Sequence, residues 1–227
     1  MEYTKQEIIN QLHECIDDIS LFYKQDFINY RGKTADTNEL YTEIISEWLI
    51  DNICLLEQIP IITRSASYAV EGHDGVPKHL DSNREEELIA MEMFRQETLP
   101  FVGKLLDYQT PLKNTRKDKA GKIDLIAYDG EILRILELKE PESKETMLRC
   151  VLEGYTYLKT VNHKKLLADF GLPPNTVVEA TPFVFYRGYQ WEEMQQNRVW
   201  LKRLMGALKI KPFYIKKENE LYVVVED

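Results

Sequence analysis

The chain has 227 residues, of which 44% are hydrophobic and 30% are charged, and its formal net charge is -9. The apolar fraction is enough for a buried core, whereas the acidic balance lacks the general basic excess that is typical of nucleic-acid binders. No run approaches the roughly 20 apolar residues of a membrane span, and the first residues do not resemble a signal peptide. The three widely spaced cysteines favour free thiols. We therefore expect a cytoplasmic protein that makes no membrane contact.

The first part of the chain is predicted to be helical. Apolar residues recur at helical spacing in residues 4–27 and again in residues 37–58. Thr4 and Glu7 match a capping box, which predicts that the first helix begins directly after Thr4.

A polar stretch, residues 64–82, interrupts this pattern with Gly, Pro and His and shows no periodicity. We expect a long loop there. The prediction is therefore an N-terminal helical element with its loop (1–80), followed by a core (81–227).

The core is predicted to be α/β (α+β), with a mixed central sheet flanked by helices. Helical periodicity alternates with short β-rich stretches bounded by Gly, Pro and Asn. In chain order we expect a helix in 81–99, a strand in 103–113, a hairpin in 121–141, a helix from 142 to about 162, a strand in 175–189, a helix in 191–210 and a strand pair in 213–227.

The hairpin carries charges inside an apolar pattern. Asp129-Gly130 is a strong signal for a two-residue turn, which would place Asp124 opposite Ile135. Because side chains alternate along a strand and opposed residues share a face, Asp124, Glu137 and Lys139 converge on one face by parity. Glu137 would then lie one diagonal step from Asp124, at a Cα separation of about 7–8 Å.

Both faces of this hairpin are otherwise apolar, which is typical of strands covered by helices on both sides. Carboxylates and an ammonium in such a setting are costly unless they are paired or bind a metal. The pattern alone therefore permits either a partly buried ion-pair cluster or a site for one hard cation.

The spacing of Asp124, Glu137 and Lys139 resembles the PD-(D/E)xK nuclease superfamily, which has the restriction-endonuclease-like fold. Here "IDL" stands in place of the first "PD". Glu153 and Tyr157 in the following helix resemble the Gln/Glu-x-x-x-Tyr element of RecB-like members. The phrases "LLDYQTPLK" and "ETMLRCVLEGYTY" are similar to uncharacterised bacterial proteins of this type. The resemblance covers roughly residues 82–190.

The resemblance implies a metal site and a catalytic lysine. Asp124, Glu137 and the main-chain carbonyl of Leu138 would ligate Mg²⁺ or Mn²⁺, which suits all-oxygen ligands. Lys139 would orient or deprotonate the attacking water, or neutralise charge on the phosphate. Members of the family often add a glutamate from the preceding helix. Among Glu85, Glu86 and Glu87 we prefer Glu86, then Glu87; favourable interaction with the helix dipole explains any of the three equally well.

The following helix and the loop before the hairpin offer further candidate site residues, some of which could contact nucleic acid. Glu153 and Tyr157 lie one helical turn apart and can both face the site, and Arg149 one turn earlier could touch a phosphate. Tyr157 could equally be a core aromatic. The loop before the hairpin offers further cations, which could track a nucleic-acid backbone or remain solvated: Lys113, Arg116, Lys117 and Lys119.

These observations together favour a Mg²⁺-dependent nuclease that hydrolyses phosphodiester bonds in DNA, acting alone, as a homodimer or with a protein partner. Two other functions remain open: a catalytically silent binding or assembly module with the same fold, and a hydrolase of another phosphate substrate.

Overall fold

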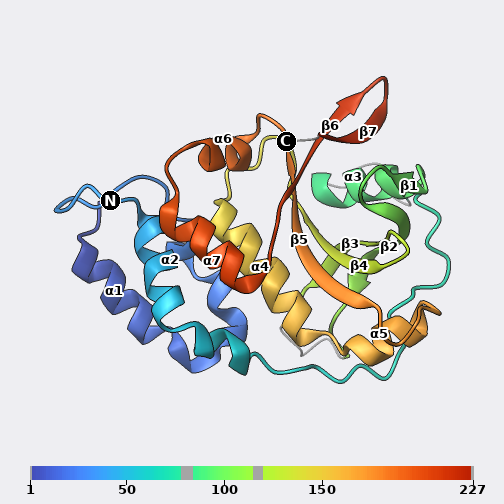
Figure 1. Ribbon diagram of the computed structural model, residues 1–227, viewed down its shortest axis with the longest axis horizontal. Helices are drawn as coiled ribbons and strands as arrows, with labels where there is room; N and C mark the ends of the chain where they lie inside the picture. The colour runs from blue at the N-terminus through green and yellow to red at the C-terminus, as the bar shows by residue number, and fades with distance from the viewer. Residues whose placement is uncertain (1, 78–83, 115–119, 226–227) are drawn as a thin grey trace.

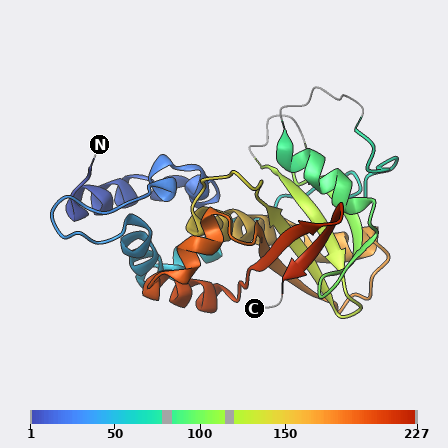
Figure 2. The ribbon, with the colours of Figure 1, turned by 90° about the horizontal axis from the view of Figure 1, so that it is seen from above.

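The computed structural model describes residues 2–77, 84–114 and 120–225. A seven-stranded mixed sheet stands at one end of the molecule, and the N-terminal helices pack with a C-terminal helix at the other end (Figures 1 and 2). The long helix α4 lies between them and packs on the sheet. The expected mixed sheet flanked by helices is confirmed.

The helices come from three parts of the chain: the N-terminal region, the two segments that flank the hairpin, and the C-terminal region. In chain order they are α1 (Lys5–Glu14), the 3₁₀-helices η1 (Ile16–Lys24) and η2 (Asp26–Asn29), α2 (Tyr41–Asp51), the 3₁₀-helix η3 (Ile53–Gln58), α3 (Glu85–Phe94), α4 (Met147–Thr160), α5 (His163–Asp169), α6 (Tyr189–Gln195) and α7 (Val199–Leu208).

The strands are ordered in the sheet as they are in the chain, from β1 to β7. Neighbours from β1 to β4 are antiparallel, β5 and β6 continue in parallel, and β7 returns antiparallel. They are β1 (Thr98–Leu99), β2 (Gly103–Pro111), β3 (Lys122–Tyr128), β4 (Ile132–Leu138), β5 (Val177–Phe185), β6 (Phe213–Glu218) and β7 (Leu221–Val225).

The first N-terminal helix begins as expected but ends earlier, and the second, expected over 37–58, is divided into α2 and η3. The capping box is confirmed, since Thr4 Oγ1 accepts from the Glu7 amide at 3.3 Å and the Glu7 carboxylate accepts from the Thr4 amide at 2.7 Å. The helix does not run on to residue 27, because α1 ends at Glu14 and a 3₁₀-helix follows. Asp18 in that segment has non-helical backbone angles and accepts from the Ser20 hydroxyl at 2.5 Å. Such local side-chain bonds compete with α-helix.

The N-terminal region shares a hydrophobic core with the rest of the chain. α2 packs on α7, η1 packs on α4, and their apolar side chains join one cluster with those of α4 and α7. The expected loop is confirmed in the described part of 64–82, which contains no helix or strand. The division of the chain near residue 80 stays a prediction.

The two faces of the hairpin pack against different helices. Ile126, Leu133 and Ile135 belong to the cluster that includes α4. Leu125, Ala127, Leu136 and Leu138 belong to the cluster that includes α3. This alternation confirms the expected sandwich, and it places Asp124 on the α4 side by parity.

The turn of the hairpin differs from the expectation by two residues in register. Tyr128 pairs with Leu133 and Ile126 with Ile135, so that the loop residues are Gly130 and Glu131. Asp129 precedes the turn, where its Oδ1 accepts from the amides of Glu131 (2.9 Å) and Ile132 (2.8 Å). Gly130 then takes the first central position with φ +106°, as glycine does in a type II′ turn.

In the observed register Asp124, Glu137 and Lys139 still share one face of the hairpin, and the two carboxylates lie closer together. Extended by one residue, the observed pairing sets Asp124 directly opposite Glu137, whereas a diagonal relation was expected. Opposed residues are nearer to each other than diagonal ones.

The expected helix over 191–210 is wrong, because the chain forms α6 and α7 with a break between them. Gln196 has extended backbone angles (φ -83°, ψ 170°). The side chain of Arg198 folds back so that its Nε donates to the Glu193 carbonyl at 3.3 Å. The Arg198 side chain thus supplies a hydrogen bond to a carbonyl in the last turn of α6.

One edge of the sheet is closed by a side chain. The amide group of Gln96 donates to the Tyr222 carbonyl at 3.0 Å and accepts from the Tyr222 amide at 2.7 Å. Gln96 lies just before β1, so this contact joins the segment at one edge strand to β7, the other edge strand.

Candidate active site

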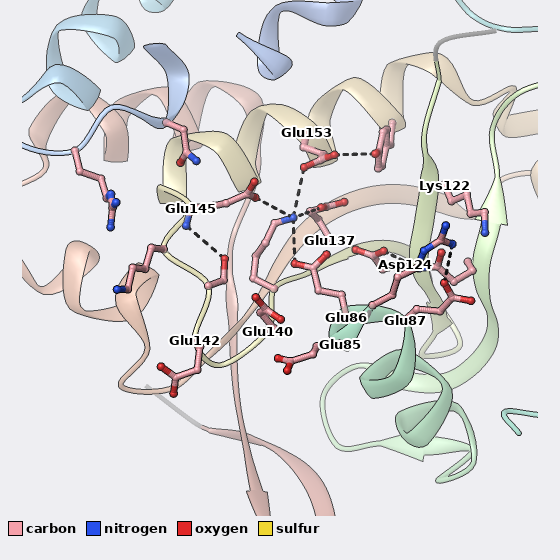
Figure 3. A pocket seen from close by; sticks show the side chains of 18 residues that line it. Glu85, Glu86, Glu87, Lys122, Asp124, Glu137, Glu140, Glu142, Glu145 and Glu153 are labelled. Atoms are coloured by element: carbon pink, nitrogen blue, oxygen red, sulfur yellow. Dashed lines mark hydrogen bonds and ion pairs between the residues drawn. The ribbon is translucent and has the colours of Figure 1, made fainter. Parts of the chain in front are cut away.

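Asp124, Glu137 and Lys139 converge where β3 begins and β4 ends. All three side chains are buried, with exposed fractions of 8%, 3% and 4%. They line a cavity of about 810 Å³ whose walls also come from α3, α4 and the segment after η2. Figure 3 shows Glu137, Glu145 and Glu153 directed toward a common point from different elements, and each lies within 4 Å of Lys139 Nζ.

Asp124 is held by two hydrogen bonds. Oδ1 accepts from Gln109 Nε2 and Oδ2 accepts from the Leu138 amide, each at 3.0 Å. Burial raises the pKa of Asp124 to about 7, and the nearby Glu86 and Glu153 also raise it, against the lowering effect of Lys139. The position is therefore an unfavourable one for a carboxylate without further positive charge.

Glu137 has one satisfied oxygen and one unsatisfied oxygen. Oε1 accepts from Lys139 Nζ at 2.7 Å, whereas Oε2 is buried and has no hydrogen-bond donor among the described residues. Burial, then the charges of Glu153 and Asp124, raise the pKa of Glu137 well above its ordinary value. Buried polar atoms are seldom left without a partner, so this oxygen is available to a further ligand.

Lys139 is surrounded by carboxylates. Burial alone would lower its pKa, but Glu137 and Glu153 outweigh this effect and raise the pKa well above its ordinary value. One ammonium group is therefore shared by four carboxylates. Its ion pairs are with Glu137 at 2.7 Å, Glu145 at 3.1 Å, Glu153 at 3.5 Å and Glu86 at 3.6 Å.

The first turn of α3 brings its three glutamates to the cavity, and they differ in their partners. Glu86 pairs with Lys139, and burial raises the pKa of Glu86. Glu87 pairs with Arg84 at 3.2 Å. Glu85 lines the cavity. Of the three, the structure thus connects Glu86 to the lysine.

Helix α4 supplies Glu153 and its support. Tyr157 Oη donates to Glu153 Oε1 at 2.8 Å, which joins the two residues as their spacing predicts. Burial would raise the pKa of Glu153, but Lys139 and Arg149 outweigh this effect and lower the pKa. Burial also raises the pKa of the Tyr157 hydroxyl well above its ordinary value. Tyr157 is thus both a core aromatic and a neighbour of the site.

The expected nucleic-acid contacts are not gathered at the cavity. Arg149 turns inward, where its Nη1 donates to the Tyr23 carbonyl and its Nε lies 3.6 Å from Glu153 Oε2. Lys113 does not line the cavity, and its carbonyl accepts from Arg64 Nη1 at 2.5 Å. The remaining candidates of this group lie outside the described residues: Arg116, Lys117 and Lys119.

Two participants were missed by sequence reasoning. Gln109 on β2 holds Asp124, and its φ of +48° gave no signal in the sequence. Glu145 pairs with Lys139 from the loop before α4. Its position next to Thr146, whose hydroxyl caps α4, could have suggested that it lies near the end of β4.

The carboxylate oxygens of the cavity suit Mg²⁺ or Mn²⁺ in their chemistry but not in their present arrangement. As the side chains stand, no group of three His, Cys, Asp or Glu residues in the described chain has a metal-binding arrangement. The carboxylates are instead turned to Lys139 Nζ. However, all of the available donors are oxygens, Glu137 Oε2 lacks a partner, and the carboxylates outnumber the ammonium. This chemistry fits a hard cation. Ligation by the Leu138 carbonyl stays a prediction.

Comparisons of the chain with models of protein families, with curated proteins and with solved structures found no match. The family resemblance therefore stays a prediction that rests on the sequence motifs. None of the helices in the described ranges has the length and apolar character needed to cross a bilayer.

Proposed function

We propose that the protein is a metal-dependent phosphodiester hydrolase of the PD-(D/E)xK type, which cleaves DNA with Mg²⁺ or Mn²⁺. The observation that carries this proposal is the unpartnered Oε2 of Glu137, buried beside Asp124 and Lys139 in an open cavity. A buried carboxylate oxygen without a donor is open to a metal ion, and it lies beside a second carboxylate that could share that ion.

The residues of the chain divide the proposed work as follows. Asp124 and Glu137 would hold the metal, and Gln109 together with the Leu138 amide fixes the orientation of Asp124. Lys139 can orient the attacking water or neutralise charge that grows on the phosphate. Glu153, held by Tyr157, keeps Lys139 in place. The metal, when bound, would polarise the phosphate and lower the pKa of a bound water.

The test is cleavage of linear, circular and single-stranded DNA and of RNA, with Mg²⁺, Mn²⁺ or EDTA. We expect cleavage of DNA that requires metal and is lost in Asp124→Ala and in Lys139→Ala. Lys202→Ala, an exposed position on α7, is the control that should retain activity. Intact nucleic acid with every metal would contradict the proposal.

The acidic cavity supports a second candidate function, the hydrolysis of a smaller phosphate ester. Carboxylates outnumber basic side chains by nine to five among the lining residues, and such a wall repels an extended polyanion. Hydrolysis of bis-(p-nitrophenyl) phosphate without cleavage of any nucleic acid would favour this candidate. Calorimetric titration with Mn²⁺ separates both hydrolases from a silent binding module, which would bind no metal.

A further inference from the structure

The cavity holds few basic groups that a substrate phosphate could use. Lys139 is surrounded by carboxylates, and Arg84 pairs with Glu87. The other three basic residues that line the cavity are exposed and have no ion-pair partner in the described part of the chain: Arg31, Lys122 and Lys144.

Arg31 differs from the two lysines because its surroundings hold it in place. Its guanidinium lies over the ring of Tyr189, 5.7 Å from the centroid. On one side of it, Asn29 Oδ1 accepts from the Thr146 amide at 2.7 Å, which ties the segment to the start of α4. On the other side, the Gly32 carbonyl accepts from the Tyr41 amide at 3.3 Å.

The chemistry of Arg31 suits a phosphate. A guanidinium group is planar, remains charged and can donate two parallel hydrogen bonds to phosphate oxygens. A side chain that is already positioned also loses less conformational entropy on binding than a free lysine does. A positive group at the wall of an acidic cavity would offset the repulsion of an anionic substrate.

We propose that Arg31 is a substrate-binding residue that holds a phosphate of the phosphodiester backbone, so that the N-terminal region forms part of the substrate cleft. This inference rests on the proposed hydrolase function. It assigns a role to a segment outside the region that resembles nucleases, and it explains why Asn29 and Arg31 line the same cavity as Asp124 and Glu137.

The chain offers a matched control in Arg187. Arg187 is also exposed and also lies over a tyrosine, with its guanidinium 5.2 Å from the centroid of the Tyr186 ring. It does not line the cavity. Loss of a cation–π contact or of one surface charge therefore affects both arginines alike, whereas loss of a substrate contact affects Arg31 alone.

The experiment compares Arg31→Ala, Arg31→Lys and Arg187→Ala in steady-state cleavage of a DNA duplex with Mg²⁺. We expect Arg31→Ala to raise KM about ten- to a hundred-fold, the range for one hydrogen bond to a charged group. Arg31→Lys should recover part of this loss, and Arg187→Ala should match the wild type. The dependence of log KM on log salt should become shallower by about 0.9 in Arg31→Ala, as for one lost phosphate contact on a duplex.

Mn²⁺ titration gives a second readout, and Arg31→Ala should bind Mn²⁺ as the wild type does. If the wild type cleaves DNA and Arg31→Ala has the KM and salt dependence of Arg187→Ala, the role of Arg31 is overturned while the hydrolase stands. If the wild type neither cleaves DNA nor binds Mn²⁺, the proposed function fails, and the role of Arg31 fails with it.

Discussion

Two buried groups of charged side chains contact α4, one centred on Arg198 and one centred on Lys139. In the first group, Arg198 Nη2 lies 3.5 Å from Glu193 Oε1, and Nη1 donates to Thr42 Oγ1 at 3.1 Å. Glu193 Oε2 accepts from the Met147 amide at 2.7 Å. One guanidinium meets one carboxylate, and neighbouring polar groups take up the remaining hydrogen bonds.

The second group has the opposite character. Four carboxylates lie within 4 Å of the single ammonium of Lys139, and Asp124 stands close enough for its pKa to be shifted by that charge. One buried oxygen of Glu137 lacks a donor among the described residues. Lys139 and Glu137 are as deeply buried as Arg198 and Glu193, so the burial of the central pair does not distinguish the two groups. The two groups differ in their charge balance: Arg198 has one carboxylate partner, whereas Lys139 has four.

The largest effect is expected from removing the ammonium of the unbalanced group. Lys139→Ala should lower kcat for DNA cleavage by about 10²–10⁴-fold, the range for a positioned proton-transfer or charge-stabilising side chain. Because it also removes the cation that holds the carboxylates, Mn²⁺ should bind more tightly to the variant than to the wild type in calorimetry. Weaker Mn²⁺ binding would show that Lys139 organises the ligands and does not compete for them.

The balanced group should respond in stability. Arg198→Ala leaves Glu193 buried without its counter-ion, which should lower the free energy of unfolding by about 3–5 kcal/mol. Urea denaturation measures this change. The double variant Glu193→Gln with Arg198→Met should recover much of it, because no charge then stays buried. If Arg198→Ala costs no more than the exposed control Lys202→Ala, the contrast between the two groups is wrong.

The pH dependence of stability should report the proton that Asp124 retains in the native state. Burial raises the pKa of Asp124 from an ordinary value near 3.8 to about 7, so the native state retains a proton that the unfolded chain has lost. Asp124 should therefore lower the stability of the metal-free protein as the pH rises from about 4 to about 7, by at most about 4 kcal/mol, and its contribution should not change above that range.

Asp124→Asn removes the contribution of Asp124 to this slope, and at pH 8 the metal-free variant should unfold at a higher temperature than the wild type. Mg²⁺ should raise the Tm of the wild type more at pH 8 than at pH 5, because the ligand must be ionised. Parallel stability curves for the wild type and Asp124→Asn would contradict the assignment.

The smallest effect concerns the support of Glu153. A Cβ on Gly121 would lie 2.2 Å from Tyr157 Oη, so Gly121→Ala should displace Tyr157 and cost about 1–3 kcal/mol, with a lower kcat. Gly206→Ala on α7 is the matched control. Nothing lies within 4 Å of its added methyl group, and it should stabilise the protein by about 0.5–1 kcal/mol. If Gly121→Ala and Gly206→Ala change the unfolding temperature equally, the proposed displacement of Tyr157 is wrong.

The convergence of the three central side chains was predictable from the alternation of side chains along the strands. Alternation along a strand survives a two-residue error in the turn, so Asp124, Glu137 and Lys139 share a face in either register. The order α3, β2, β3, β4, α4, β5 was also predictable, because each of these segments has a clear period, whereas the short elements β1 and α5 were not expected.

The remaining parts depend on contacts that sequence spacing does not encode. The turn register follows from the Asp129 carboxylate, and the break before α7 follows from the Arg198 side chain. Gln109, Glu145 and Arg31 reach the cavity from separate elements, and only the packing of the chain brings them together.

The contact between Gln96 and Tyr222 also bears on how this protein meets copies of itself. An outer strand with free amides and carbonyls can recruit another chain and begin aggregation. Here one side-chain amide bonds to both main-chain groups of Tyr222, the second residue of the short strand β7. An approaching strand would have to displace Gln96 before it could extend the sheet. A residue with no part in the proposed chemistry thus protects the molecule from association at that edge.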